Sequence, residues 1–318
     1  MEITHSLRER FVKDYKIPIK IFREPYFSYQ LALFDTYYDC VDKYSIFINS
    51  VNKYPNEEEY YCFYNTTKDI IMNYVKNNSA FLEFNNCDMS EWNKVLATIS
   101  KHQFLSKDIY KKSFVGRRFL SIDMIKANFN VLKHYNPKIF NNVETYEDFI
   151  HMFTKDENIV NSKHIREVIF GQCNCGRHIT YERYLMAKLV LSVLNDEIRD
   201  TKVTQSVVFF SNDEVIFDIT DMSEEQIKKI SNAFKNLTVV PLRFEQFTLK
   251  CIYKDNIDDI AYIKEFDDGK ITIKKYQSFY LPIIIKYLKN EPVIEEDLIF
   301  EHNDILCKIL EVPNIHIE

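Results

Sequence analysis

Glycine is scarce in this sequence, with 4 glycines among 318 residues. A glycine-rich phosphate loop needs several closely spaced glycines, because the backbone itself must wrap around the phosphate group. No such cluster occurs here, and no Ser-His-Asp pattern typical of nucleophilic hydrolases occurs either. We therefore do not interpret the chain as a P-loop enzyme or as a serine hydrolase.

Long apolar runs and a secretion signal are also missing from the sequence. No uncharged run of 18 residues appears, so we expect no membrane span and no membrane partner. The N-terminal residues lack the basic and then apolar layout of a signal peptide. Seven scattered cysteines without such a signal predict reduced thiols. The expected location is a reducing intracellular compartment, either cytoplasm or nucleus.

The length of 318 residues allows two domains, or one large domain with additions. Residues 27–34 and 67–75 place aromatic and aliphatic side chains at helical spacing. We therefore predict a mostly helical N-terminal region over residues 1–112, with a few short strands and with aromatic side chains in its core. A core region over residues 113–248 and an acidic C-terminal α+β extension over residues 249–318 complete the predicted organisation.

Several local patterns predict single elements. A helix is expected over residues 182–198, where apolar residues recur on one face. In the C-terminal extension, two strands should meet in a hairpin at residues 267–270. A helix should follow over residues 281–289, with a proline near its first turn.

Charge is distributed unevenly along the chain. The net charge is −6, and residues 251–318 alone carry 8 lysines against 14 acidic residues. Residues 101–120, in contrast, carry 6 basic residues against one acidic residue. The basic block in this segment consists of Lys111, Lys112, Arg117 and Arg118. Two interpretations remain open for it, a contact with a nucleic-acid backbone near an active site or an exposed, solvated connector.

Two adjacent carboxylates stand between two apolar runs in residues 207–218. Each run is typical of a short strand, so Asp213 and Glu214 are expected at the turn of a β-hairpin. Carboxylates held in this way can bind a divalent metal beside a phosphate. The alternative is an ordinary solvated acidic turn.

Two upstream segments add groups suited to the same chemistry. An apolar strand leads to Asp123, after which the spacing becomes helical, so this carboxylate should stand at a strand-to-helix junction. Residues 162–171 are predicted to form a helix with Lys163, Arg166 and Phe170 on roughly one face. Cations and an aromatic ring one turn apart suit a triphosphate and a base.

Taken in order, these segments resemble the palm and fingers of family A DNA polymerases. Asp123 matches the aspartate of the first palm motif, while Arg166 and Phe170 match the lysine and the ring of the fingers helix. Residues 212–214 match the His-Asp-Glu hairpin. A predicted helix over 223–234 and the segment 237–244 are similar to the helix and the Val-Pro-Leu strand that end the palm.

The sequence also departs from the family pattern. Arg166 stands in place of lysine, Asn212 in place of histidine, and Asn128 in place of the glutamate that packs against the sugar. Asn174 and Cys175 occupy the positions of the tyrosine and glycine that usually end the fingers helix. The family has a far longer segment between its fingers helix and its hairpin. These departures bear on template dependence and on sugar selectivity.

The resemblance implies an α/β (α+β) fold, in which an antiparallel polymerase-like palm sheet carries helices packed on one face. It implies nucleotidyl transfer to the 3′ end of DNA or RNA, with nucleoside triphosphates as substrates and two Mg²⁺ or Mn²⁺ ions as cofactors. By this resemblance, Asp123 and Asp213 bridge the metals, and Glu214 assists them in metal binding. Arg166 and Lys163 neutralise the triphosphate. Phe170 stacks on the nucleotide, and Asn128 contacts the nucleotide.

Two alternatives remain open at this point. The chain could be a palm-derived nucleic-acid-binding or replication-accessory protein that has lost synthesis, with replication proteins as candidate partners of its N- and C-terminal regions. Separately, Cys173, Cys175 and His178 could start a zinc site, although the spacing is not the usual one; otherwise these cysteines are structural.

Overall fold

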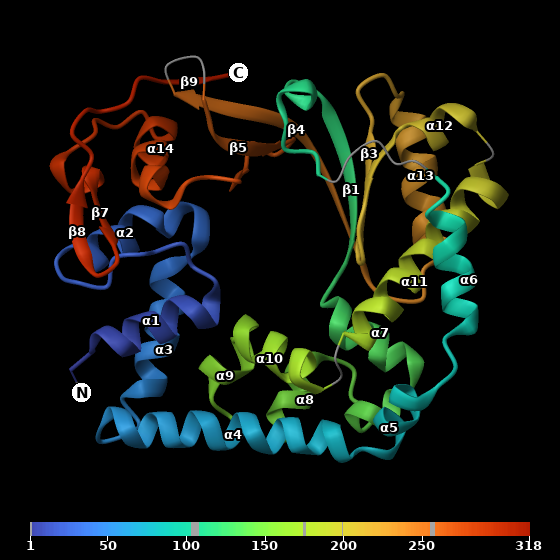
Figure 1. Ribbon diagram of the computed structural model, residues 1–318, viewed down its shortest axis with the longest axis horizontal. Coiled ribbons are helices and arrows are strands. Elements are labelled where there is room, and N and C mark those ends of the chain that lie inside the picture. The colour runs from blue at the N-terminus through green and yellow to red at the C-terminus, as the bar shows by residue number, and fades with distance from the viewer. Residues whose placement is uncertain (1, 103–107, 174–175, 199, 255–257) are drawn as a thin grey trace.

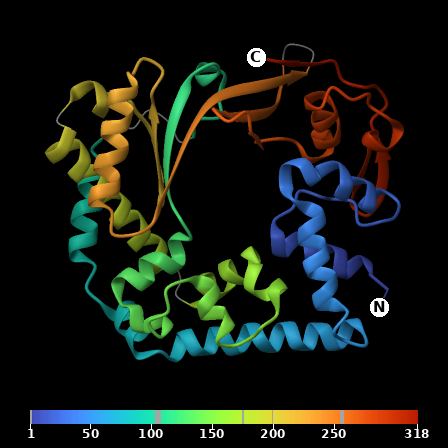
Figure 2. The same cartoon turned by 180° about the vertical axis from the view of Figure 1, so that it is seen from behind.

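The computed structural model describes the chain except for residues 1, 103–107, 174–175, 199 and 255–257. It is an α+β protein in which helices surround one large antiparallel sheet. In Figures 1 and 2 the elements trace a ring: α4 runs along one side, the sheet stands on another, and the two terminal regions lie together on a third. No helix in the described ranges is long and apolar enough to cross a membrane.

The N-terminal region is helical, as predicted, although the described part of residues 1–112 contains no strand. Its helices bury aromatic rings, which form much of the core. The six helices are α1 (His5–Tyr15), α2 (Tyr26–Tyr38), α3 (Cys40–Val51), α4 (Glu57–Asn77), α5 (Ser79–Asn86) and α6 (Ser90–Ile99). The longest of them, α4, begins after Asn56, whose side chain accepts a hydrogen bond from the Glu59 amide and so caps the helix.

The large sheet is antiparallel throughout, with the order β2-β3-β1-β4-β5-β6 and with β9 paired to β4. Its strands are β1 (Arg118–Met124), β2 (Val207–Phe210), β3 (Glu214–Asp218), β4 (Leu242–Lys254), β5 (Asp258–Phe266), β6 (Ile271–Lys274) and β9 (Ile315–Ile317). The predicted hairpins at residues 211–213 and 267–270 are both present. Strand β4 crosses the predicted boundary at residue 248, so the C-terminal strands extend the sheet of the core.

The two faces of β1 have different surroundings because successive side chains point to opposite sides of a strand. Leu120, Ile122 and Met124 belong to the main core, which includes side chains of α7, α11 and α13. Phe119 packs on the other face in a separate, smaller core cluster. Asp123 belongs to this second face, at the end of the strand where the small cluster no longer covers it.

The remaining helices connect and cover these strands. They are α7 (Ala127–Tyr135), α8 (Tyr146–His151), α9 (Glu157–Asn161), α10 (Lys163–Cys173), α11 (Arg177–Ser192), α12 (Thr201–Gln205), α13 (Glu224–Leu237) and α14 (Leu281–Leu288), with a π-helical turn, η3 (Val193–Ile198), after α11. The short 3₁₀ turns are η1 (Lys112–Phe114), η2 (Pro137–Phe140), η4 (Ser278–Tyr280) and η5 (Glu295–Leu298). The helices predicted at 162–171, 182–198, 223–234 and 281–289 are confirmed, with shifted ends.

The C-terminal region closes the ring against the N-terminal helices. Helix α14 packs against α2, and the small hairpin of β7 (Ile299–His302) and β8 (Ile305–Lys308) lies beside them (Figure 1). The Arg23 guanidinium forms an ion pair with Glu301 at 3.2 Å. Tyr29 donates a hydrogen bond to Asp297 at 2.5 Å. The two ends of the chain are therefore joined by polar contacts as well as by packing.

Candidate functional site

A cavity of about 790 Å³ opens where β1 ends. Six parts of the chain border it: the end of β1, the start of α7, α10, the start of α11, the β2–β3 turn and the start of β4. Five of the residues predicted from the sequence line this one cavity: Asp123, Asn128, Lys163, Arg166 and Asp213. Residues far apart in the sequence are thus brought together by the fold.

Asp123 and Glu214 lie on neighbouring strands, and Asp213 lies in the turn just before Glu214. Asp123 is directly opposite Glu214 in the β1–β3 register, and the Met124 amide donates a hydrogen bond to the Asp213 carbonyl at 2.9 Å. Burial raises the pKa of Asp123 to about 6; Arg243 lowers it, while the Asp213 and Glu214 carboxylates raise it. The end of β1 therefore carries a concentration of negative charge inside a partly buried site.

Arg243 is a site residue that the sequence analysis did not single out. It stands opposite Asp123 in the β1–β4 register, and its guanidinium forms an ion pair with Asp123 at 2.7 Å. A second contact joins it to Glu245 at 3.3 Å. The sequence places Arg243 directly after the segment that resembles the Val-Pro-Leu strand. However, only the strand register reveals that it neutralises Asp123.

Glu214 does not line the cavity, although it is adjacent to Asp213. Its carboxylate accepts a hydrogen bond from Ser121 at 2.5 Å and lies 4.0 Å from the Lys264 ammonium group. Lys264 is buried, with its ammonium group 4.4 Å from the centroid of the Phe247 ring. Glu214 therefore participates in a buried polar cluster on the sheet, and only Asp213 of the pair faces the cavity.

Helix α10 presents two cations to the cavity and buries its aromatic ring. Lys163 and Arg166 line the cavity, and the Arg166 guanidinium lies 5.6 Å from the centroid of the Tyr146 ring. Phe170 is only 1% exposed and packs against Phe140 and Tyr146. The expectation that Phe170 is partly exposed and stacks on a nucleotide is therefore wrong, because this ring belongs to the core.

Buried hydrogen bonds fix the start of α10. The Ser162 hydroxyl accepts a hydrogen bond from the Ile165 amide at 3.0 Å and donates one to Asp14 on α1 at 3.1 Å. Asp14 also accepts a hydrogen bond from Tyr64 on α4 at 2.7 Å, and burial raises its pKa. These contacts tie α10 to two N-terminal helices. They hold the turn that carries Lys163 in one orientation.

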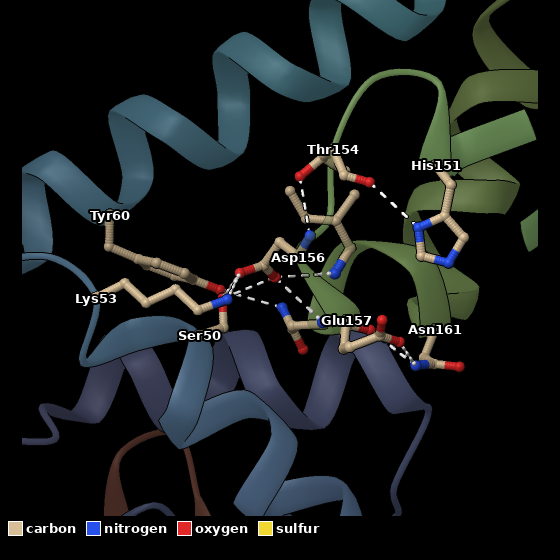
Figure 3. Close-up of polar contacts among 10 residues, drawn as sticks. Ser50, Lys53, Tyr60, His151, Thr154, Asp156, Glu157 and Asn161 are labelled. Carbon is tan, nitrogen blue, oxygen red and sulfur yellow. Dashed lines mark hydrogen bonds and ion pairs between the residues drawn. The ribbon is translucent and has the colours of Figure 1, made fainter.

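A second polar cluster fixes α9, the short helix just before α10. Asp156 caps α9 by accepting hydrogen bonds from the amides of Asn158 and Ile159. Its carboxylate also accepts a hydrogen bond from Ser50 at 2.8 Å and from Lys53 at 2.9 Å, so α9 is tied to α3 and to the residues just after it. Figure 3 shows Ser50 and Lys53 converging on this carboxylate. The N-terminal helices thereby support the side of the cavity that carries the cations.

Asn128 lines the cavity from the first turn of α7. Its side-chain carbonyl accepts a hydrogen bond from the Phe129 amide at 2.9 Å, which leaves the amide group of the side chain as a donor. The neighbouring Lys126 forms an ion pair with Glu147. Asn128 therefore lines the same cavity as Asp123 and Arg166.

The basic block lies away from the acidic end of the sheet. Arg118 begins β1 and Asp123 stands five residues later, so roughly 17 Å of strand separates them. Arg117 pairs with Asp218 at 2.8 Å, Arg118 with Glu224 at 3.5 Å, Lys112 with Asp259 at 3.4 Å, and Lys111 covers the Phe114 ring at 4.5 Å. The block therefore lies at the opposite end of β1 from Asp123, and three of its four cations are paired with carboxylates.

Two buried residues of α11 also face the cavity; Glu182 was not predicted as a site residue, and His178 was named only for the zinc alternative. His178 and Glu182 line the cavity and are four residues, about one helical turn, apart on α11. Burial, and then the Asp213 carboxylate, raise the pKa of Glu182 to about 8. Burial lowers the pKa of His178 to about 4. Both side chains are therefore mainly uncharged at neutral pH, and their helical spacing was the only sequence signal for them.

Oxygen donors in the cavity match the preference of Mg²⁺ and Mn²⁺ for carboxylates. Within the described ranges, no three histidine, cysteine or acidic side chains are close enough to form a ready-made metal cage. Mg²⁺ usually binds through one or two carboxylates together with substrate phosphates, so Asp123 and Asp213 fit this ion. For the zinc alternative, Cys175 lies outside the described residues, and nothing further bears on it.

No protein-family model matches the sequence, and a search of curated proteins finds no significant match.

Proposed function

We propose that this cavity is a nucleotidyl-transfer site, which adds nucleotides to the 3′ end of DNA or RNA with Mg²⁺ or Mn²⁺ as cofactor. One observation carries the proposal: a carboxylate at the end of β1, a carboxylate in the β2–β3 turn and two cations from a separate helix line the same cavity. Nucleotidyl transfer needs groups that hold metals next to groups that neutralise a triphosphate, and it needs little other chemistry from the protein.

The roles of the residues follow from their positions. Asp123 and Asp213 would hold the metal, which supplies Lewis-acid polarisation of the phosphate when bound. Lys163 and Arg166 attract the triphosphate from α10, and the planar guanidinium of Arg166 suits a bidentate contact with phosphate oxygens. Asn128 offers its amide as a hydrogen-bond donor from α7. Glu214 supports this arrangement through Ser121 and Lys264 rather than from within the cavity.

The test is the binding of metal and nucleotide by the full chain, measured as a shift in melting temperature. At a ligand concentration of roughly 100 times Kd, specific binding should stabilise the protein by about 2.7 kcal/mol. Asp213→Asn should abolish the shift that depends on Mg²⁺ or Mn²⁺. Asp221→Asn, which changes an exposed acidic residue outside the cavity, should retain it. Equal shifts in both variants would contradict the assigned role of Asp213.

One observation favours a second function, a nucleic-acid-binding or replication-accessory protein without synthesis. Arg243 already neutralises Asp123 at 2.7 Å, so an internal cation takes the place that a metal would need. In that case the cations of α10 would bind phosphate without metal. The protein would then bind nucleotide or single-stranded nucleic acid with the same affinity in Mg²⁺ and in a chelator. Such a result would favour this function over the first one.

A further inference from the structure

The carboxyl group of Glu182 lies in the cavity without a partner. The residue is 7% exposed and lines the cavity from α11. No hydrogen bond or ion pair joins its side chain to any residue within the described ranges. The carboxyl oxygens are not among the fully buried unpaired atoms, so they are open to the cavity, where a ligand can form hydrogen bonds with them. The packing of the sheet and helices does not account for it.

The surroundings of Glu182 indicate which part of a ligand it would meet. Phosphate groups should lie on the α10 side, because Lys163 and Arg166 attract them there and the mainly protonated Glu182 offers them no positive charge. Ile179 lies one turn before Glu182 on α11, lines the same cavity and is 40% exposed. An apolar side chain next to a hydrogen-bonding group without a net charge is typical of a surface that holds the uncharged part of a small molecule.

We propose that Ile179 and Glu182 form the nucleoside subsite of the cavity. Glu182 forms hydrogen bonds with N–H or O–H groups of the base or sugar, and Ile179 packs against the nucleoside. This inference rests on the proposed function, and it assigns a role to α11 that neither the metal nor the triphosphate requires. A volume of about 790 Å³ suits a ligand that combines phosphates with a nucleoside.

The experiment compares two ligands that share their phosphates. Nucleoside triphosphates and inorganic tripolyphosphate are titrated into the full chain in Mg²⁺ by calorimetry. Glu182→Leu should weaken nucleoside triphosphate binding at least about tenfold, which corresponds to about 1.4 kcal/mol. Its affinity for tripolyphosphate should stay within about twofold, because this probe has no nucleoside. Glu182→Gln, which keeps hydrogen-bonding capacity, should retain most of the affinity, and Glu225→Leu on the exposed face of α13 should retain all of it.

Four outcomes would overturn the subsite. Equal weakening of both ligands by Glu182→Leu would place Glu182 with the metal or the phosphates. Unchanged binding in folded Glu182→Leu would make the residue structural. A wild-type protein that binds tripolyphosphate as tightly as a nucleoside triphosphate would leave the phosphate site standing and remove the nucleoside subsite. A wild-type protein that binds neither ligand would refute the proposed function itself, and the subsite with it.

Discussion

Replacing Glu182 by glutamine should stabilise the metal-free protein at alkaline pH. The reason is that burial raises the pKa of this carboxyl group to about 8, from an ordinary value of 4.5. Between these two values the folded state holds a proton that the unfolded state has released. Stability therefore falls as the pH rises through this range. A functional carboxyl group that weakens the fold in this way is common in ligand-binding cavities.

The size of the effect follows from the difference between the two pKa values. One pKa unit corresponds to about 1.4 kcal/mol, so a difference of about 3.5 units sets an upper limit of roughly 5 kcal/mol at pH 9. Glutamine has nearly the same shape and does not ionise, so Glu182→Gln should remove this pH-dependent loss. At pH 5, where the wild-type carboxyl group is already protonated in the folded state, the variant and the wild type should have similar stability.

The assay is urea denaturation of both proteins in chelator, at several pH values between 5 and 9. The free energy of unfolding of the wild type relative to that of Glu182→Gln should decline from pH 5 to about pH 8 and level off above it. Glu225→Gln, an exposed change on α13, should follow the wild type and serves as the control. If Glu182→Gln shows the same pH dependence as the wild type, the burial argument for Glu182 is refuted.

Two further predictions concern α10. Arg166→Ala should weaken tripolyphosphate binding about tenfold or more in calorimetry, because it removes a cation that lines the cavity. The control Lys229→Ala, on the exposed part of α13, should bind tripolyphosphate as the wild type does. Equal affinities of Arg166→Ala and the wild type would show that Arg166 does not contact phosphate. Phe170→Ala should lower the free energy of unfolding, measured by urea denaturation, by roughly 3–5 kcal/mol, as expected for a buried ring. A loss below about 1 kcal/mol would contradict the place of Phe170 in the core.

Local sequence patterns predicted much of the arrangement around the cavity. The strand that leads to Asp123, the hairpin at Asp213 and the helix that carries Arg166 each have a clear period of apolar residues. The capped helix α13 has the same kind of signal, with Ser223 and Gln226 forming a capping box. Such patterns depend on neighbours within a few residues. They can therefore be read without knowledge of the rest of the fold.

Features that depend on distant neighbours were missed or misplaced. Arg243 meets Asp123 only because β4 pairs with β1 in one register, across a separation of 120 residues. Phe170 was expected to be exposed because it shares a helix face with Arg166, yet rings from η2 and α8 enclose it. Glu182 is buried by packing that its own segment does not reveal. In each case tertiary contacts set the environment, and the sequence period does not encode them.

The predicted boundary at residue 248 falls inside strand β4. The acidic composition of residues 251–318 marks a change of charge but not a structural boundary. Strand β4 continues across residue 248 because its later half pairs with β5 and β9. The region then returns to the N-terminal helices through contacts such as the Arg23–Glu301 ion pair. Composition alone cannot show such a closure between the two ends of a chain.

The most direct test of the central claim is incorporation of labelled nucleotides by the purified full chain. Deoxynucleotides and ribonucleotides are supplied to DNA and RNA primers, with and without a template, in Mg²⁺ or Mn²⁺. We predict metal-dependent extension of the 3′ end, and a loss of at least about 10³-fold in rate for Asp213→Asn, roughly 4 kcal/mol of transition-state stabilisation. Asp221→Asn should extend primers as the wild type does. Absence of extension on every primer, or extension that Asp213→Asn leaves unchanged, would contradict a nucleotidyl-transfer site at Asp123 and Asp213.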